Sequence, residues 1–519
     1  MTKIRILWAD DEIALLKPHI LFLEAKNYDV TPANSGDEAL DLIEDNRYDL
    51  VFLDENMPGI SGLETLTKIK SMSPSLPVIM ITKSEEESIM EDAIGAKISD
   101  YLIKPVNPNQ ILLTIKKHLD TARLVSEKTT IGYQQDFRNI GMSLHNNMDY
   151  EDWEDVYKKL IYWEIELEKS EDTGMSEILN TQKEEAGNLF ARFVKDNYLD
   201  WMEYPEGAPL MSHNVFKEKV YPLIQKDGST FLIVIDNLRL DQWQILKPQI
   251  EEMFWIDSEE TYMSILPTTT QYARNALFAG LMPLDIQKMY PKLWLNDEDD
   301  GGKNMNEQEL IGHQLKRLGK DTRFAYNKVL NPSYGRKVVS EIPNQMNNAF
   351  NVIVYNFIDM LSHARTDTDI IKELAEDEAA YRSLTLSWFD HSPLKEALKE
   401  IAARGGKVVI TTDHGSIKVK KASKVIGDKT VNTNLRYKQG KNLSYEADDV
   451  FAITKPEEAR LPKVNVSQAF IFAKGDAFFA YPNNFNHYVS YYKNTFQHGG
   501  ISLEEMMVPI IQLYPKKVN

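Results

Sequence analysis

Short apolar runs alternate with amphipathic helical stretches over the first 120 residues. Each run is only a few residues long and is rich in β-branched or aromatic residues, as buried strands are. The runs read IRILWA, YDVTPA, YDLVFLD, LPVIMIT and ISDYLI. Helical patterns between successive strands are typical of a parallel, doubly wound sheet. The pattern therefore predicts one α/β domain over residues 1–120.

A different periodicity follows over residues 121–206. The stretch DWEDVYKKLIYWEIELEK places its apolar residues three and four positions apart, which predicts an amphipathic helix. These apolar residues are Trp153, Val156, Leu160, Trp163 and Leu167. The neighbouring stretches read similarly, so we expect a helical linker bundle that joins two α/β domains. The turn-forming segment YPEGAP at 204–209 predicts the next domain boundary.

Residues 207–519 return to an α/β rhythm. Three core strands are predicted there: FLIVID ending at Asp236, NVIVYNFID ending at Asp359 and KVVITTD ending at Asp413. In open α/β sheets, ligands bind at the carboxyl ends of the strands, which is where these acidic residues lie. The stretches 284–345 and 415–495 fit the core pattern poorly, and we expect them to be insertions or caps over a site.

Length and composition fit a soluble protein of several domains. A chain of 519 residues exceeds what one core holds, and roughly two to four domains are expected. The sequence has no run of about 18 apolar residues, so we expect no transmembrane helix. The start, MTKIRILWADDE, has no basic segment followed by a long apolar stretch, so we expect no secretory signal.

The net charge of −19 is unevenly distributed. Residues 1–120 hold 12 Lys+Arg against 21 Asp+Glu, and residues 121–210 hold 9 against 19. The remainder is balanced at 38 against 38. An acidic front half argues against a DNA reader, because binding to phosphates needs a basic surface. The balanced back half leaves room for an anionic substrate.

The first candidate site consists of polar residues at the ends of predicted strands: Asp10, Asp11, Asp54, Thr82 and Lys104. One such aspartate alone is more often a solvated cap, but the full set in this order favours phosphorylation of Asp54. Transfer of a phosphoryl group to a carboxylate needs a divalent ion, and Asp10, Asp11 and Asp54 offer oxygen ligands for Mg²⁺. The Thr82 hydroxyl and the Lys104 ammonium group can bind the phosphate.

This segment resembles the receiver domains of bacterial response regulators, which have a flavodoxin-like fold. The resemblance implies that Asp54 takes its phosphate from a cognate histidine kinase. It also implies that Tyr101 turns inward as Thr82 moves to the phosphate, and that a face built from about residues 84–120 then favours a homodimer. Lys83 stands where receivers usually have a small residue, a difference that bears on the lifetime of the phosphate or on access by partners.

The second candidate site lies in the back half. Its members are Asp236, Thr270, Asp359, His363, Asp413, His414 and His498. Without cysteine, a metal must bind to His, Asp, Glu or hydroxyl groups, as zinc can. Six Asp and His residues with one hydroxyl suit two ions roughly 4 Å apart. Any one of these residues alone would more often be a turn, a structural histidine or a helix cap, so the prediction depends on the whole set.

These residues resemble the alkaline phosphatase superfamily, near its nucleotide pyrophosphatase/phosphodiesterase branch, and in particular the PglZ domain. Residues 267–283 have the spacing of the family's nucleophile turn, which places the nucleophile at Thr270. The family pattern assigns one zinc to Asp359, His363 and His498. It assigns the other zinc to Asp236, Asp413 and His414, with Thr270 bridging. The implied reaction is attack of Thr270 on phosphorus, followed by hydrolysis of the phosphothreonine.

One departure from the family pattern leaves the substrate class open. The diesterase branch has an Asn three residues after the nucleophile, where this chain has Ala273. Arg274 or Asn275 could bind the substrate oxygen instead. The loop 415–441 carries basic residues at Lys418, Lys420, Lys421, Lys424, Lys429, Arg436, Lys438 and Lys441. Binding of further phosphates by this loop and a simply solvated loop are equally good interpretations.

The three-part order resembles a class of Bacteroidetes response regulators linked to gliding and type IX secretion. That resemblance implies a cytoplasmic phosphodiesterase acting on cyclic or linear oligonucleotides, dimerisation on phosphorylation, and contact with a sigma factor or a secretion-system component. The main alternative is a signalling adaptor that binds zinc and partners without turnover. A DNA-binding transcription factor is disfavoured, because residues 121–210 are acidic and show no helix-turn-helix pattern.

Overall fold

The computed structural model describes residues 3–73, 76–83, 98–170, 173–225, 228–297, 299, 301–320, 322–367, 377–427 and 432–516. The chain forms two compact units, residues 1–132 and residues 133–519. The division falls inside the helix α6 (Thr121–Ser143). The predicted domain boundaries at residues 120 and 206 therefore stay predictions.

The first unit is built on a parallel sheet with the strand order β2-β1-β3-β4-β5. Its strands are β1 (Ile4–Ala9), β2 (Tyr28–Ala33), β3 (Leu50–Asp54), β4 (Val78–Thr82) and β5 (Asp100–Ile103). Its helices include α1 (Lys17–Glu24), α2 (Gly36–Asp45), α3 (Gly62–Met72) and α5 (Pro108–Ile115). Alternate residues of the central strands enter two separate apolar clusters, one on each face of the sheet. All five predicted strands are present, and the flavodoxin-like strand order confirms the predicted fold.

The helical linker has two long helices, α7 (Tyr150–Ser170) and α8 (Thr173–Glu203), after α6. The five residues that predicted the amphipathic helix are all buried in α7. They belong to the same continuous apolar core as the strands of the α/β domain that follows. Residues 133–203 are therefore packed onto that domain as part of one structural unit. A 3₁₀ turn, Pro205–Gly207, lies in the predicted boundary segment.

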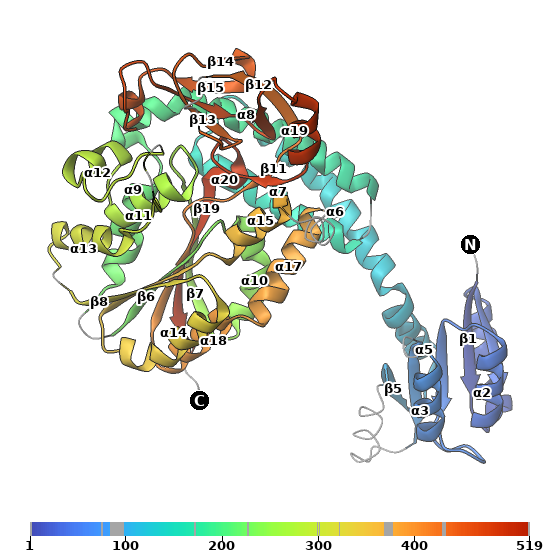
Figure 1. Cartoon of the computed structure of the whole chain (residues 1–519). Coiled ribbons are helices and arrows are strands. Elements are labelled where there is room, and N and C mark those ends of the chain that lie inside the picture. The colour runs from blue at the N-terminus through green and yellow to red at the C-terminus, as the bar shows by residue number, and fades with distance from the viewer. Residues whose placement is uncertain are drawn as a thin grey trace. The chain divides into compact units, whose positions relative to one another are not determined.

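A six-stranded sheet with the order β7-β19-β10-β6-β9-β8 forms the centre of the second unit. Its strands are β6 (Thr230–Ile235), β7 (Phe254–Met263), β8 (Phe324–Val329), β9 (Phe350–Tyr355), β10 (Lys407–Thr411) and β19 (Met507–Pro515). β10, β6, β9 and β8 are parallel, whereas β19 and β7 are antiparallel to their neighbours. Figure 1 shows α9, α11 and α13 on one side of this sheet and α10, α15 and α17 on the other.

The helices of this domain connect the strands and cover the sheet. They are α9 (Ser212–Val215), α10 (Leu240–Glu251), α11 (Asn275–Ala279), α12 (Pro283–Met289), α13 (Glu307–Arg317), α14 (Pro332–Gln345), α15 (Phe357–Asp367), α17 (Glu378–Asp390), α18 (Pro393–Ala403) and α20 (Leu503–Met506). Together with the sheet they give the predicted α/β class.

Two of the predictions for this domain were wrong. The stretch 284–345 is not simply an insertion, because it contains β8, an edge strand of the main sheet, and the crossover helix α14. β8 was missed because it lies at the edge, where its residues are only half-buried and its pattern is not strongly apolar. The strand predicted to end at Asp359 ends at Tyr355, and Asp359 lies in the first turn of α15.

Residues 415–497 form small sheets outside the six-stranded sheet, as expected for a cap. Their elements are β11 (Ile417–Lys418), β12 (Lys421–Ile426), β13 (Tyr437–Gly440), β14 (Ser444–Tyr445), β15 (Val450–Ile453), β16 (Ala469–Ala473), β17 (Ala477–Ala480), α19 (Phe485–Tyr492) and β18 (Phe496–Gln497). The sheets are β11-β18, β14-β12-β17 and β13-β16-β15.

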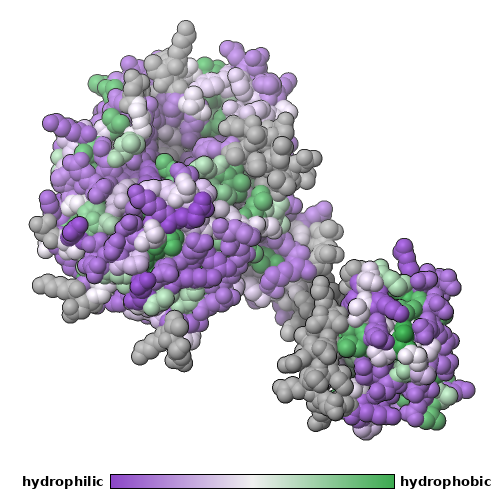
Figure 2. Space-filling view, turned by 60° about the horizontal axis from the view of Figure 1, so that its bottom comes forward, coloured by the Kyte–Doolittle hydropathy of each residue, from purple (hydrophilic) through white to green (hydrophobic). Residues whose placement is uncertain are grey.

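Hydrophilic residues cover most of the visible face of each unit, and the hydrophobic patches between them are small (Figure 2). Among the helices of the described residues, none is long and apolar enough to cross a membrane.

Candidate functional sites

An acidic pocket lies at the carboxyl ends of β1 and β3. Asp10 follows β1 and Asp54 ends β3, and both are buried. Asp11 is exposed, and one carboxylate oxygen from each of the three residues lies within 4.8 Å of the others. Oxygen ligands in this arrangement suit a hard cation such as Mg²⁺.

A lysine neutralises part of this pocket. Lys104 Nζ lies 2.8 Å from Asp10 Oδ2 and 2.9 Å from Asp54 Oδ1. Burial raises the pKa of Asp54, and Lys104 opposes that rise without cancelling it. Thr82 is buried at the end of β4, on the same edge of the sheet, whereas the Tyr101 side chain is 38% exposed. Residues 84–97 of the predicted switch face lie outside the described residues.

The turn after Asp54 requires a glycine. A Cβ atom on Gly62 would lie 2.3 Å from the carbonyl oxygen of Asp54, so any larger residue would push α3 away from β3. Ser61 caps the same helix by accepting a hydrogen bond from the Glu64 backbone N–H, and Glu64 accepts one from Ser61 in return. The chain after β3 is thereby held close beside Asp54.

In the second unit, the order of the sheet brings the predicted metal ligands together. Asp236 directly follows β6, and Asp413 and His414 follow the neighbouring strand β10. β9 lies on the other side of β6 and leads into α15, which carries Asp359 and His363 one turn apart. Parallel strands end at the same edge, so all five side chains reach one place.

His498 is brought to this edge by the cap. It follows β18, which pairs with β11, and β11 begins three residues after His414. The rings of His414 and His498 stack, with 4.3 Å between their centres. The two strands of this small sheet therefore lead directly to two of the predicted ligands.

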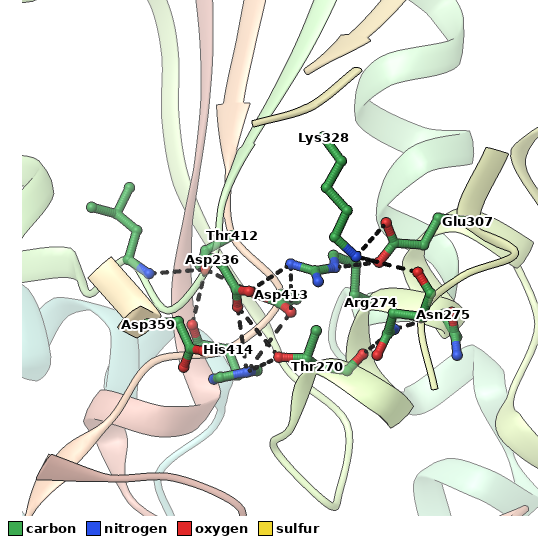
Figure 3. Close-up of polar contacts among 12 residues, drawn as sticks. Asp236, Thr270, Arg274, Asn275, Glu307, Lys328, Asp359, Thr412, Asp413 and His414 are labelled. Carbon is green, nitrogen blue, oxygen red and sulfur yellow. Dashed lines mark hydrogen bonds and ion pairs between the residues drawn. The ribbon is translucent and has the colours of Figure 1, made fainter. Parts of the chain in front are cut away.

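The first group of ligands consists of Asp236, Asp413 and His414, all fully buried, with ligand atoms within 4.8 Å of one another. His414 Nε2 lies 3.8 Å from both Asp236 Oδ1 and Asp413 Oδ2. Thr270 faces this group: its Oγ1 lies 3.1 Å from His414 Nε2 and 3.4 Å from Asp236 Oδ1 (Figure 3). The predicted nucleophile therefore lies at hydrogen-bonding distance from two predicted ligands.

The second group consists of Asp359, His363 and His498. Asp359 Oδ2 lies 3.5 Å from His363 Nε2, and Asp359 Oδ1 lies 3.6 Å from His498 Nε2. The His363 side chain is 63% exposed, whereas that of His498 is largely buried. This group thus lies at the open side of the site, and the first group lies deeper.

Two histidines are oriented by backbone carbonyls. His498 Nδ1 lies 3.2 Å from the Thr268 carbonyl oxygen, and His414 Nδ1 lies 3.1 Å from that of Gly415. A ring that donates from Nδ1 presents the lone pair of Nε2, which is the usual arrangement for a metal ligand. Burial lowers the pKa of His498 well below its usual range, so this ring is neutral, as a ligand must be.

Some oxygens of the candidate ligand carboxylates have no hydrogen-bond donor among the described residues. Asp359 Oδ1 and Asp413 Oδ2 are buried and accept no hydrogen bond from any described residue. Burial and the nearby Asp236 raise the pKa of Asp359 to about 6, and the same two causes raise that of Asp413. Burial also acts on Asp236, but Arg274 and His414 reverse it and lower its pKa. Orphaned carboxylate oxygens beside imidazole rings fit divalent cations.

The two residues predicted as substrate contacts are both buried. Arg274 Nη1 lies 2.8 Å from Asp236 Oδ2 and 3.7 Å from Asp413 Oδ2, and its Nε lies 2.7 Å from Glu307 Oε1. Asn275 donates a hydrogen bond to the Lys303 carbonyl and accepts one from Asn304. Arg274 thus lies behind the ligands and holds their carboxylates (Figure 3). Neither geometry favours contact with a substrate.

Sequence analysis missed two residues behind Arg274. Glu307 is buried, and Lys328 Nζ lies 3.3 Å from it, which completes a row of alternating charges that ends at Asp236. Both lie in the stretch 284–345 that was predicted to be an insertion. No local motif marks either residue, since the contacts join segments far apart in the sequence.

The basic side chains of loop 415–441 lie in two environments, one buried and one exposed. Arg436 is buried and paired with Glu505 at 2.6 Å, and Lys438 is buried and donates to the Asn432 carbonyl at 2.8 Å. Burial lowers the pKa of Lys438 to about 8. Lys421 and Lys424 on β12 are exposed. Some of the loop is thus structural and some is available at the surface, while residues 428–431 lie outside the described residues.

Comparison with known families divides the chain into three successive matches. The response regulator receiver domain matches residues 6–116, and the PorX response regulator linker domain matches residues 123–202. The BREX system PglZ alkaline phosphatase-like domain matches residues 215–513. This is the architecture of PorX-type response regulators.

Similar proteins share only part of the chain. The transcriptional regulatory protein ResD of Bacillus subtilis is 31% identical over 147 residues, which are 28% of this chain and 60% of ResD. The alginate biosynthesis transcriptional regulatory protein AlgB of Pseudomonas putida is 36% identical over 120 residues, 23% of this chain and 27% of AlgB. Among solved structures, a CheY-like receiver domain protein from Methanospirillum hungatei is 33% identical and covers 23% of this chain and 95% of its own, with a TM-score of 0.23. The chain spans less than two thirds of the length of the first two relatives.

These matches define a two-component regulator with a phosphoesterase-like effector domain. The receiver match supports the response-regulator class for the first unit. The PglZ domain places the effector in the alkaline phosphatase superfamily and supports a phosphoesterase-type enzyme. Because the PglZ match covers more than half of the 519 residues, the chain belongs to the PglZ family of alkaline phosphatase-like proteins.

Proposed function

We propose that the effector domain is a two-zinc phosphodiesterase under the control of the receiver. The position of Thr270 carries this proposal: its hydroxyl meets His414 and Asp236 at 3.1 and 3.4 Å, beside a second ligand group around Asp359. One group of ligands would contain Asp236, Asp413 and His414, with Thr270 bridging. The other would contain Asp359, His363 and His498.

Zinc is the ion that these residues fit best. The chain has no cysteine, and each group combines carboxylate with imidazole, which zinc accepts and which Mg²⁺ sites seldom include. Two bound zinc ions would lower the pKa of the attacking hydroxyl and neutralise the charge that develops on the phosphate. The row formed by buried Arg274 and Glu307 and half-buried Lys328 would keep the first group rigid.

The chemistry of the chain itself centres on Thr270. Its Oγ1 forms a bond to phosphorus, and the ester bond to the leaving oxygen breaks on the opposite side. Oγ1 lies 3.1 Å from His414 Nε2 and 3.4 Å from Asp236 Oδ1, and its proton would leave to one of these two acceptors. Water then attacks the phosphothreonine, which releases a phosphomonoester and restores the hydroxyl. His498 and Asp359, which belong to the second group, would help to stabilise the leaving oxygen.

The test of this function combines metal analysis with an assay on bis-p-nitrophenyl phosphate. We expect about two zinc ions per chain and release of p-nitrophenol by the wild-type protein. Bound zinc without turnover of this diester or of p-nitrophenyl phosphate would contradict the enzyme. That outcome would favour the zinc-binding adaptor that contacts a sigma factor or a secretion component.

The basic charge and the aromatic rings of the cap support an oligonucleotide as the substrate. Residues 415–498 hold 13 Lys+Arg against 7 Asp+Glu, in a chain whose net charge is −19. Beside β12 lies α19, whose rings follow one another at 6.4 Å between His487 and Tyr491 and at 6.3 Å between Tyr488 and Tyr492. Aromatic rings beside lysines are the means by which proteins bind single-stranded nucleic acid.

Replacing Tyr488, which is 38% exposed, with Ala should weaken binding of a short single-stranded oligonucleotide. Loss of one base-stacking ring should raise KM about tenfold, while turnover of bis-p-nitrophenyl phosphate stays unchanged because that diester is too small to reach α19. Tyr204→Ala, which removes an exposed ring outside the cap, is the matched control. Equal KM values for the wild-type protein and Tyr488→Ala would rule out this surface.

For the receiver, we propose that Asp10, Asp11 and Asp54 bind Mg²⁺ and that phosphorylation of Asp54 drives formation of a homodimer. Thr82, Lys104 and the outward-facing Tyr101 would carry the switch. The resemblance to PorX-type regulators further leads us to propose a cytoplasmic role in gliding or type IX secretion.

Asp54→Ala should abolish dimerisation induced by beryllium fluoride and Mg²⁺, because the analogue needs the carboxylate oxygen of Asp54. Sedimentation of the full chain with and without the analogue measures the change. Asp41→Ala, which removes an exposed carboxylate of α2, should dimerise like the wild-type protein. Analogue-dependent dimers of Asp54→Ala would show that the switch does not depend on this residue.

A further inference from the structure

A buried arginine lies behind the metal-ligand groups. Arg239 is three residues after Asp236 and is only 2% exposed. Its Nε and Nη2 donate to both oxygens of Asp241 at 2.9 and 2.5 Å, and Nη2 also donates to Glu378 at 2.5 Å. Its Nη1 donates to the Ser416 carbonyl at 3.5 Å. Four contacts from one guanidinium fix it in a single position.

These contacts place Arg239 next to the segments that carry the ligands. Ser416 is two residues after His414, and the guanidinium carbon lies 5.0 Å from the centre of the Phe496 ring, two residues before His498. Arg239 therefore touches two ligand-bearing segments and belongs to a third. It reaches no ligand side chain itself, so its effect on the site would be one of positioning.

The ion-pair network around Arg239 extends away from the site, because Arg239 and Arg382 share a carboxylate partner. Asp241 Oδ2 also accepts a hydrogen bond at 2.7 Å from Arg382 of α17. Arg382 lies 3.5 Å from Glu164 and pairs with Glu168, both on the linker helix α7. The chain of contacts thus passes from the α/β domain into the linker.

The second linker helix joins the same row. Lys183 of α8 donates to Glu164 at 2.7 Å. Burial would raise the pKa of Glu164, but Lys183 and Arg382 bring it down to about 2, so the carboxylate stays charged. A cavity of about 380 Å³ borders Glu164, Lys183 and Glu378, so α7 and α8 are not closely packed against the α/β domain at this place. Removing one partner of a buried ion pair is costly. A shift of α7 or α8 would therefore weaken the other ion pairs of the row.

The linker helices are in turn fixed to the end of α6. Trp163 Nε1 donates to Asp136 Oδ2 at 3.0 Å, and Gln182 Nε2 donates to the Phe137 carbonyl at 3.0 Å. α6 is one helix from Thr121 to Ser143 and begins just after the receiver match. A movement of α6 would therefore reach both α7 and α8.

We propose that Arg239 is a positioning residue for the metal ligands, and that the row Arg239–Asp241–Arg382–Glu164 makes metal affinity depend on the packing of linker helices α7 and α8. This inference rests on the proposed two-zinc site and names the route by which the linker regulates it. Coupling of this kind is reciprocal, so metal binding also stabilises the packing of the linker helices.

The test breaks the row at Arg382, which is linked to Arg239 through their shared partner Asp241. Arg382→Met should weaken zinc binding by the full chain about tenfold, measured by competition with a chromophoric chelator. It should lower kcat for bis-p-nitrophenyl phosphate and leave KM nearly unchanged. Arg382→Lys should recover part of the affinity, because it restores the charge without the two-sided contact. Arg404→Met, which breaks an exposed pair with Glu400 on α18, is the matched control and should behave as wild type.

A second readout does not depend on catalysis. Zinc added to the metal-free chain should slow amide hydrogen exchange in α7 and α8, and Arg382→Met should lose this protection. If Arg382→Met does not fold, Glu168→Gln serves instead: its side chain is 33% exposed, and we expect a loss of roughly threefold in zinc affinity.

The outcomes separate the inference from the function on which it rests. Wild-type affinity in folded Arg382→Met or in Glu168→Gln, with no change in exchange, overturns the coupling while the zinc enzyme stands. A wild-type chain that binds no zinc overturns the proposed function, and the coupling with it. Loss of affinity equal to that of Arg404→Met would show a general loss of stability and would also reject the coupling.

Discussion

Thr270→Val should keep both zinc ions and lose hydrolysis of bis-p-nitrophenyl phosphate by roughly 10⁴-fold or more, the usual cost of removing a nucleophile. Valine has the shape of threonine without the hydroxyl, so the turn before α11 should stay intact. Only the bond from Oγ1 to phosphorus becomes impossible. The comparison requires kcat and zinc content from the same preparation, because a loss of metal would reduce the rate for a different reason.

Two control substitutions test whether the loss of activity is specific to the Thr270 hydroxyl. Thr270→Ser keeps a hydroxyl and should keep turnover within about tenfold of the wild-type rate. Thr269→Val removes a buried hydroxyl that has no hydrogen-bond partner among the described residues, and turnover should stay near the wild-type rate. Acid quenching during turnover should trap phosphate on Thr270 in the wild-type protein and none in Thr270→Val. Phosphate trapped on another residue, or turnover retained by Thr270→Val, would move the nucleophile elsewhere.

The receiver fold could be predicted almost completely from the sequence. Buried parallel strands have to be apolar on both faces, so runs such as LVFLD and VIMIT stand out from the helices between them. The reactive residues Asp54 and Thr82 end these strands, and their position along the chain already places them on one edge. The contact between Lys104 and both Asp10 and Asp54 follows from the same rule.

The effector sheet was only partly predictable, for two physical reasons. β7 reads FWIDSEETYM and β8 reads FAYNKV, and their half-buried positions carry charged or polar residues that hide the strand pattern. β19 lies between β7 and β10, although it ends the fold in sequence, and no local pattern states where a strand inserts. The candidate ligand residues, which the structure brings together, could still be identified, because an aspartate or histidine beside a strong apolar strand is a local signal.

The charges behind the site could not be predicted in the same way. Arg274 was one of two candidates for binding the substrate oxygen, and it lies between Glu307 and Asp236, which are 33 and 38 residues away in the sequence. Arg382 meets Glu168 across 214 residues. A salt bridge has no periodicity, and its partner can be any opposite charge that the fold brings near. Such contacts therefore had to come from the structure.

Removing zinc with a chelator should lower the stability of the second unit by about 4 kcal/mol for each ion present at 1,000 times its Kd. Binding to the folded state alone gives this linkage, and the repulsion among the carboxylates that chelation leaves behind is one of the terms that set Kd. Asp236, Asp359 and Asp413 are brought together in a buried site, where their mutual repulsion is poorly screened. The receiver has no part in this, and its own transition should not move.

Asp413→Asn should shift the melting temperature in opposite directions with and without zinc, which a general loss of stability would not do. With zinc present, the variant should melt below the wild-type protein, because it has lost a charged ligand. Without zinc, it should melt above the wild-type protein, because an amide replaces a buried carboxylate whose charged form is disfavoured. His313→Gln, a change at a partly exposed histidine outside both groups, should follow the wild type under both conditions. Calorimetry of the three proteins, each with zinc and after chelation, measures this crossover. A variant that melts below the wild type in both conditions would mean that the carboxylates are stabilised by the protein rather than by a metal.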